Sequence, residues 1–262
     1  MMPQDTGAEL LVEIAGPIAI VTLNRPQARN ALTFEMYDGL AAFCRGIDPD
    51  GEIKAVIVTG AGDRAFAAGT DIAQFRDFST AEDALAYEKR IEAVLTAIET
   101  CPVPTIAAVA GACTGGGAGI ASACDIRIAA RNAKFGFPIA RTLGNCLSMA
   151  NYARLAALIG AGRVMEIIFT ARLLEAEEAK AAGLVSEVLE DHPALMRRAS
   201  ELAHMLAGHA PLTMRATKEA LRRVRQGRTD GDDLVAMCYT SADFREGLEA
   251  FLEKRPAEWK GR

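Results

Sequence analysis

Two glycine-bearing turns are the segments of this chain best suited to chemistry. The first is Phe66-Ala67-Ala68-Gly69-Thr70-Asp71, and the second is Gly111-Ala112-Cys113-Thr114-Gly115-Gly116-Gly117-Ala118-Gly119. Each turn follows an apolar stretch and precedes a predicted helix, so each can aim free backbone N–H groups at an anion. Two such turns could hold one developing oxyanion. Acids for proton transfer are scarce beside them, because Asp125 is the only carboxylate between residues 111 and 154.

A dinucleotide loop is one alternative for the second turn. Gly117-x-Gly119-x-x-Ser122 nearly fits the G-x-G-x-x-G pattern, but its third position is Ser and no acid follows about twenty residues later. A phosphate-binding P-loop does not fit, because no Gly-Lys-Ser/Thr follows the glycines. The turn alone therefore leaves open an anion site, a nucleotide site and simple tight packing of a helix on a strand.

The composition fits a globular protein and argues against one that binds nucleic acid or membranes. Half of the 262 residues are hydrophobic, 24% are charged, and the net charge is −5. A negative total argues against non-specific binding to nucleic acid or to an anionic membrane. The six cysteines form no C-x-x-C pair and the three histidines show no ligand spacing, so we expect no metal site and a reducing cytoplasm.

One uncharged segment, residues 101–124, has the length of a membrane span, and Gly111-x-x-x-Gly115 resembles a helix-dimer motif. Pro102, Pro104 and five glycines interrupt this segment. We therefore expect a buried strand, a turn and a helix rather than a membrane helix.

The periodicity of apolar residues predicts strands that alternate with helices. Strands are expected at Leu10–Ala15, Ile18–Leu23, Lys54–Thr59, Thr105–Ala110, Asp125–Ala130 and Leu184–Leu189. The early helices are expected after the N-cap Thr33, after a capping box Ser79-x-x-Glu82 as far as about Glu99, and after the second glycine turn. The later helices are expected at Met149–Ile159, Arg163–Thr170, Glu175–Ala182, Pro193–Ala207, Pro211–Arg225 and Gly231–Lys254. This order predicts an α/β fold with a largely parallel, helix-covered sheet and a helical last third.

Taken in order along the chain, the motifs resemble the crotonase superfamily, that is, the enoyl-CoA hydratase/isomerase family. The matching segments are Asn24–Leu32, Ala65–Ile72, the second glycine turn running into Ala123–Ala129, Ala179–Val185 and Glu246–Arg255. The resemblance covers nearly the whole chain. It implies a spiral of ββα units over residues 1–195, a helical C-terminal assembly or lid region over residues 196–262, and homotrimers or hexamers.

The resemblance also implies an acyl-CoA substrate and no tightly bound cofactor, with coenzyme A entering as part of the substrate. In this family two backbone N–H groups hold the thioester oxygen, and matching residue by residue places them at Thr70 and Gly116. The matched substrate-binding positions are Arg25 and Ala28 near the phosphates and adenine, Ala67 and Ala68 at the bend of the CoA arm, Asp71 and Ile72 after the first turn, and Phe251 and Lys254 closing from the tail. Asp71 also suits a helix cap better than a proton carrier.

The acid and base positions depart from the family pattern. A hydratase of this family carries glutamates where this chain has Gly119 and Ile139, and Leu147 stands where isomerases and hydrolases often carry an aspartate. Polar residues that could replace these acids are Tyr87, Glu88, Thr114, Ser122, Arg141, Thr142, Asn145, Cys146 and Ser148. Arg141 and Asn145 are the preferred pair, because a guanidinium could bind an acyl carboxylate and so suit decarboxylation.

Three functions follow from these observations. The first is an acyl-CoA lyase or isomerase that stabilises a thioester enolate with non-standard acid and base groups. The second is a CoA-thioester-binding protein that has lost catalysis, and the third is a nucleotide-binding α/β protein. The cluster Arg222, Arg223, Arg225 and Arg228 is expected to be a solvated helix face.

Overall fold

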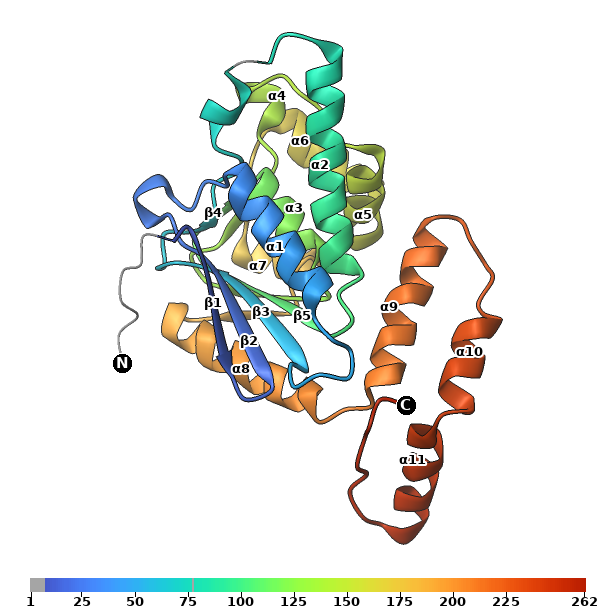
Figure 1. The fold of residues 1–262 in the computed structure, drawn as a ribbon. Helices are drawn as coiled ribbons and strands as arrows, with labels where there is room; N and C mark the ends of the chain where they lie inside the picture. The colour runs from blue at the N-terminus through green and yellow to red at the C-terminus, as the bar shows by residue number, and fades with distance from the viewer. Residues whose placement is uncertain (1–7, 77) are drawn as a thin grey trace.

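A six-stranded sheet forms the centre of the molecule in the computed structural model, which describes residues 8–76 and 78–262 (Figure 1). The strands lie in the order β1-β2-β3-β5-β7-β10. Only β1 runs antiparallel to its neighbour, and the other neighbours are parallel. Their bounds are β1 Leu10–Ala15, β2 Ile18–Leu23, β3 Ala55–Gly60, β5 Thr105–Val109, β7 Ile126–Ala130 and β10 Glu187–Leu189. The predicted α/β class is confirmed.

Helices cover both sides of this sheet, as the apolar strands require. Every residue of β3 and β5 is buried, which is typical of a parallel strand between two helical layers. Helices α1 (Phe34–Gly46), α2 (Ala81–Glu99) and α3 (Gly116–Ala123) pack into the larger core cluster, and α8 (His192–Ala207) packs on the opposite side of the sheet (Figure 1). Since α8 crosses residue 195, core packing continues beyond the expected division of the chain.

A second, smaller sheet carries the two glycine turns. It consists of β4 (Ala65–Ala67), β6 (Ala112–Thr114), β8 (Lys134–Gly136) and β9 (Leu174–Glu175). The neighbours β4 and β6 are parallel, so the turns that follow them leave the sheet at the same edge. The sequence analysis did not predict these strands, because two or three residues are too few to show a period.

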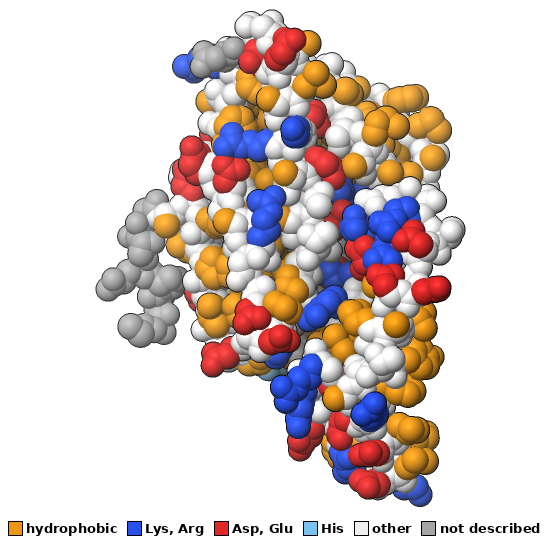
Figure 2. All heavy atoms as spheres, turned by 45° about the vertical axis from the view of Figure 1, so that its right-hand side comes forward, with side chains coloured by type: hydrophobic (Ala, Val, Ile, Leu, Met, Phe, Trp, Pro, Cys, Tyr) orange, Lys and Arg blue, Asp and Glu red, His pale blue; other side chains and the backbone are white. Residues whose placement is uncertain are grey.

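The last three helices form a lobe beside the core (Figure 1). They are α9 (Pro211–Arg225), α10 (Asp232–Tyr239) and α11 (Ala242–Glu253). The single helix predicted over residues 231–254 is wrong, because the chain breaks at Thr240 and the side chain of Ser241 caps a new helix by accepting from the N–H of Phe244. Apolar side chains gather on the surface of this lobe (Figure 2), and the large exposed ones are Leu221, Val224, Val235, Tyr239, Phe244, Leu248, Phe251 and Leu252.

The capping box of α2 lies one residue later than predicted. Thr80, not Ser79, is the N-cap, and Asp83, not Glu82, is the acid that reaches back to it. The Thr80 hydroxyl accepts from the N–H of Asp83, while the Asp83 carboxylate accepts from the N–H groups of Ser79 and Thr80. A Thr and Asp pair therefore replaces the expected Ser and Glu pair in the same local geometry.

Three of the remaining helices lie close to their predicted positions, namely α5 (Met149–Ile159), α6 (Ala161–Thr170) and α7 (Ala176–Ala181). The short helix α4 (Ile139–Thr142) was not predicted, and 3₁₀ turns form at η1 (Pro26–Ala28) and η2 (Ile72–Phe75). Residues 101–124 form β5, β6 and α3, as expected for a buried segment. Within the described ranges, no helix combines the length and apolar character that crossing a bilayer would take.

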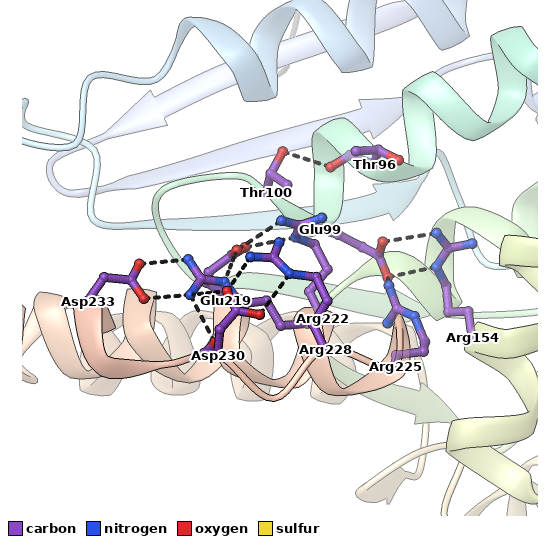
Figure 3. A network of polar contacts seen from close by, with 11 residues as sticks. Thr96, Glu99, Thr100, Arg154, Glu219, Arg222, Arg225, Arg228, Asp230 and Asp233 are labelled. Atoms are coloured by element: carbon purple, nitrogen blue, oxygen red, sulfur yellow. Dashed lines mark hydrogen bonds and ion pairs between the residues drawn. The ribbon is translucent and has the colours of Figure 1, made fainter. Parts of the chain in front are cut away.

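The arginines at the end of α9 form ion pairs and are not the solvated face predicted for them (Figure 3). Arg223 pairs with Glu219 and with Asp233, and Arg225 reaches Glu99 of α2 at 2.6 Å. Arg154 of α5 binds the same Glu99 at 2.8 Å. Glu99 thus receives two guanidinium groups, and this contact ties the C-terminal lobe to the core (Figure 3).

Candidate active site

A cavity of about 190 Å³ lies where the two glycine turns meet α2 and the segment around α4. Both turns contribute to its wall through Gly69, Thr70, Gly115 and Gly116. The rest of the wall consists of Ala68, Ile72, Phe75, Tyr87, Glu88, Ile91, Thr114, Gly119, Pro138, Ile139, Thr142, Leu143, Asn145, Leu147 and Asn151. The lining is mostly apolar with a few polar groups, which is the usual character of a small-molecule site.

The two glycine turns are in direct contact at this cavity. Gly69 and Gly115 have φ values of 105° and 52°, in the left-handed region that favours glycine. A Cβ placed on Gly115 would lie 3.5 Å from the Cα of Gly69. The sequence analysis proposed that the turns act together, and the structure brings them together.

The backbone N–H groups of Thr70 and Gly116 have no acceptor within residues 8–76 and 78–262. Thr70 forms a parallel bridge with Leu32, in which the carbonyl of Gly69 and the N–H of Asp71 make the bonds. This leaves the N–H of Thr70 pointing away from the bridge. Gly116 is the first residue of α3, where an N–H has no partner within the helix. Two unpaired donors therefore belong to residues of one cavity wall.

Close packing accounts for two of the consecutive glycines in the second turn. A Cβ on Gly116 would lie 1.8 Å from Tyr37 Oη, and a Cβ on Gly117 would lie 2.3 Å from the carbonyl oxygen of Ala67. Neither position can hold a side chain without a rearrangement. The glycines thus let α3 and its first N–H approach β4 and α1 closely.

A chain of three hydroxyl groups runs past Gly116 into the cavity. Tyr37 Oη lies 2.9 Å from Thr70 Oγ1, and Thr70 Oγ1 lies 2.8 Å from Tyr87 Oη. Tyr37 is fully buried, whereas Thr70 and Tyr87 line the cavity. Burial raises the pKa of both tyrosines, so their hydroxyls keep their protons at neutral pH.

The positions expected for hydratase glutamates carry no ionisable group but do lie on the cavity wall. Gly119 and Ile139 line the cavity, and so does Leu147. A Cβ on Gly119 would make only ordinary contacts, 3.6 Å from Leu95 Cδ1 and 3.8 Å from Asn151 Nδ2. Gly119, Ile139 and Leu147 thus lie on the cavity wall, and none of their side chains can transfer a proton.

Glu88 is the carboxyl group that lines this cavity. It lies one residue after Tyr87 on α2 and is half-buried. Burial raises its pKa above the ordinary 4.5, a backbone hydrogen bond with Ser148 lowers it, and the charge of Glu92 raises it. Residues with such raised pKa values in cavities are candidates for acid and base roles. Sequence analysis named Glu88 among nine substitutes, but no spacing rule singled it out.

Behind Glu88, a buried arginine holds two further acids of α2. Arg154 is only 2% exposed, and its Nη2 lies 3.1 Å from Glu92 while its Nε lies 2.8 Å from Glu99. The hydroxyl of Ser148 donates to Glu92 at 3.1 Å. The charge of Glu92, which acts on Glu88, is therefore fixed in place.

The preferred pair of Arg141 and Asn145 is not brought together at the cavity. Asn145 lines the cavity, whereas Arg141 is exposed and does not belong to its wall. Asn151, which sequence analysis did not name, does line it and is 5% exposed. Its Oδ1 is buried without a donor among the described residues, so a ligand or a water molecule could supply one.

Asp71 caps the turn η2, as expected. Its Oδ1 accepts from the N–H of Ala73 at 3.0 Å, and this bond, with that from Arg25, lowers the pKa of Asp71. Arg25 binds Asp71 Oδ2 at 2.9 Å and the carbonyl oxygen of Ala31 at 2.7 Å, and its Nε lies 2.9 Å from Glu9. The Nη1 of Arg25 is thus occupied within the chain, whereas its buried Nε is ion-paired with Glu9 but has no hydrogen-bond partner among the described residues.

The other predicted binding residues are not brought together at one place. Ala68 and Ile72 line the cavity, and Ala67 lies fully buried directly behind it. Ala28 ends η1. Phe251 is 81% exposed near the end of α11, and Lys254 follows that helix, so both lie on the C-terminal lobe and outside the cavity wall.

Comparison with known proteins agrees with this fold. The family model described as enoyl-CoA hydratase/isomerase matches residues 13–262. The short-chain-enoyl-CoA hydratase of Clostridium acetobutylicum is 36% identical over 254 residues, covering 95% of this chain and 96% of that protein. The crotonyl-CoA hydratase of Syntrophomonas wolfei is 34% identical, covering 95% and 97%.

Solved structures show the same similarity. An enoyl-CoA hydratase/carnithine racemase from Magnetospirillum magneticum superposes with a TM-score of 0.89 at 35% identity, covering 97% of this chain and 96% of that one. The enoyl-CoA hydratase of Bacillus anthracis gives 0.86 at 33% identity, covering 97% and 100%. This chain therefore belongs to the enoyl-CoA hydratase/isomerase family, and its architecture is the crotonase-like α/β fold. This family membership does not favour the alternative of a nucleotide-binding α/β protein.

Proposed function

We propose that the chain is an acyl-CoA enzyme that stabilises the enolate of a CoA thioester between the N–H groups of Thr70 and Gly116. The observation that carries this proposal is that two unpaired donors and one carboxyl of raised pKa belong to a single cavity. An enolate gathers charge on its oxygen, and donors fixed in advance need no reorganisation. Each such donor contributes about 3–4 kcal/mol to the transition state.

Glu88 is the proton-transfer group of this proposal. Its raised pKa brings it nearer to neutrality than an ordinary glutamate, which suits a group that both takes and returns a proton. As a base, the Glu88 carboxylate takes a proton from the α-carbon, and the electrons of that C–H bond move to the thioester oxygen. As an acid, the protonated Glu88 returns the proton to the α- or γ-carbon of the substrate. Alternatively, Glu88 stays protonated while another group attacks the substrate.

Decarboxylation is supported less well than proton transfer. That reaction would need Arg141 to bind the acyl carboxylate, but Arg141 lies outside the cavity wall. The curated relatives carry hydratase names, and a hydration route here would need a water held by groups other than Gly119 and Ile139. Glu88, Asn145 and Asn151 are among the polar side chains in the cavity that could hold it.

The C-terminal lobe suits assembly into the proposed homotrimer or hexamer. Its exposed apolar side chains would be covered by another copy of the chain (Figure 2). Phe251 and Lys254 lie on this lobe, so their proposed contact with the CoA arm would be made at the cavity of a neighbouring copy. Sedimentation of the purified chain, compared with that of a Phe251→Asp variant, tests this assembly.

One experiment tests the function. The protein is incubated with enoyl-, 3-hydroxyacyl- and malonyl-type CoA esters, and the products are read by mass spectrometry and NMR. A gain or loss of water indicates hydratase chemistry, a shifted double bond with no mass change indicates isomerisation, and loss of CO2 indicates decarboxylation. Binding of CoA esters with no conversion of any ester would instead favour the catalytically inactive binding protein, and binding of NAD alone would contradict the proposal.

A further inference from the structure

The hydroxyl chain of Tyr37, Thr70 and Tyr87 contains more hydrogens than its own bonds use. Three hydroxyl groups carry three hydrogens, and the chain makes two hydrogen bonds. Thr70 Oγ1 is the middle member and can donate to only one of its two neighbours. One hydroxyl hydrogen is therefore left over in every arrangement.

Burial decides which end of the chain holds the spare hydrogen. Tyr37 is 0% exposed, and the hydrogen bond that its hydroxyl makes at 2.9 Å is with Thr70 Oγ1. A spare hydrogen on Tyr37 would be buried without an acceptor, which is unfavourable. Tyr37 thus donates to Thr70, and the spare hydrogen belongs to Thr70 or Tyr87, both of which line the cavity.

We infer that Tyr87 presents its hydroxyl hydrogen as a third donor to an oxygen of the bound acyl thioester. Tyr37 donates to Thr70 and Thr70 donates to Tyr87, so the hydrogen of Tyr87 stays free for the ligand. This inference rests on the proposed function. Tyr87 is held firmly for such a role, since its ring packs edge-on against Phe75 at 4.8 Å between centroids and lies 6.1 Å from the ring of Phe34. Glu88 follows it on α2, so a donor and a proton carrier adjoin each other on the cavity wall.

The test uses acetoacetyl-CoA, whose enolate absorbs ultraviolet light when it is bound. The full-length protein is titrated with this ester, and the enolate fraction is measured against pH. We expect Tyr87→Phe to lower the enolate ionisation constant roughly ten- to a hundredfold, because a donor to a charged oxygen is lost. The affinity for free CoA should not change, since CoA carries no acyl oxygen.

Two further variants separate donation from packing. In Tyr87→Phe the hydroxyl of Thr70 still has a hydrogen to offer, so Thr70→Val combined with Tyr87→Phe should show the larger loss. Tyr37→Phe keeps the hydroxyls of Thr70 and Tyr87, so its effect should be smaller than that of Tyr87→Phe. Tyr239→Phe, at an exposed tyrosine of α10, is the matched control and should equal the wild type.

The outcomes are distinguishable. If the wild type binds no acetoacetyl-CoA, the proposed function fails. If the wild type stabilises the enolate and Tyr87→Phe does so equally well, only the third donor is refuted. A loss in Tyr37→Phe equal to that in Tyr87→Phe, with the same fall in Tm, would show that the hydroxyl chain serves packing alone and would also overturn the inference. A saturated acyl-CoA has the thioester oxygen as its single acyl oxygen. If Tyr87→Phe weakens the binding of this ester too, the thioester oxygen is the one that receives the hydrogen bond.

Discussion

The hydroxyl of Tyr37 occupies the space that a side chain at Gly116 would need, 1.8 Å from the position of its Cβ. Tyr37 Oη is also hydrogen-bonded to Thr70 Oγ1. One buried tyrosine therefore contacts both Thr70 and Gly116, the two residues that carry the proposed N–H donors. The spacing of the proposed donors therefore depends on a residue of α1 that the glycine motifs do not include.

This packing predicts opposite effects for two glycines of the same helix. Gly116→Ala should lower the free energy of unfolding by about 1–3 kcal/mol and abolish acyl-CoA conversion, because the new Cβ displaces Tyr37. Gly119→Ala has only ordinary contacts and an interior helix position, so it should raise stability by up to about 1 kcal/mol. Urea unfolding of both variants checks this, and equal losses would contradict the packing argument.

Glu88 should limit stability at neutral pH. Its pKa is raised in the folded protein, so the folded state binds its proton more tightly than the unfolded state does. Stability from this group is therefore present at low pH and falls as the pH rises from about 4.5 through the folded pKa. Glu88→Gln should match the wild type in Tm near pH 4 and exceed it near pH 7, as thermal unfolding across this range would show.

A control isolates this effect. Glu13→Gln changes an exposed glutamate of β1 and should leave the Tm of the wild type unchanged at both pH values. If Glu88→Gln behaves like Glu13→Gln, then Glu88 is not held in a desolvated position and is a poor candidate for proton transfer.

Arg154 should be essential for folding stability. It is buried and pairs with Glu92 and Glu99, so Arg154→Ala leaves the Glu92 carboxylate without a guanidinium partner and leaves Glu99 paired with Arg225 alone. A loss of about 3–5 kcal/mol is expected, as for other broken buried pairs. Arg163→Ala removes a more exposed pair and should cost no more than about 1 kcal/mol. Chemical denaturation that gives similar losses for the two would refute a special role for Arg154.

Substitutions of Asn145 and of Arg141 should affect turnover differently. Asn145 lines the cavity and Arg141 does not, so Asn145→Ala should change kcat/KM while Arg141→Ala stays within about twofold of the wild type. Kinetics with the best ester from the panel provides the measurement. A large loss in Arg141→Ala confined to esters with a terminal carboxylate would restore the decarboxylase hypothesis.

Long apolar patterns made most of the fold predictable. The strands β1 and β2 and the helices α5 and α9 begin and end where periodicity and turn residues placed them. The sequence did not predict the break before Ser241 or the short strands β4, β6, β8 and β9. The short strands depend on pairing partners that are distant in the sequence, and the break depends on a capping residue that is one of several of equivalent type. A local sequence pattern specifies neither.

The sequence pointed to the backbone groups of the candidate site more readily than to its side chains. The glycine turns indicated two sets of free N–H groups, and the family resemblance assigned Thr70 and Gly116 within them. Glu88 carries no such signal, because a glutamate on an amphipathic helix ordinarily belongs to the solvated face. Its exposure to the cavity follows from how α2 packs over the glycine turns, and the sequence does not state that packing.

Hydrogen exchange at the α-carbon tests the central claim most directly. In D2O, a saturated acyl-CoA that enters the cavity loses its α-proton to Glu88, the Glu88 carboxyl exchanges this proton for deuterium from the solvent, and the deuteron returns to the α-carbon with no net reaction required. We predict deuterium at the α-carbon with the wild-type protein, detected by NMR, and a loss of at least about a hundredfold in rate with Glu88→Gln. An exchange rate unchanged by Glu88→Gln, or no exchange by a wild-type protein that binds the ester, would contradict the account.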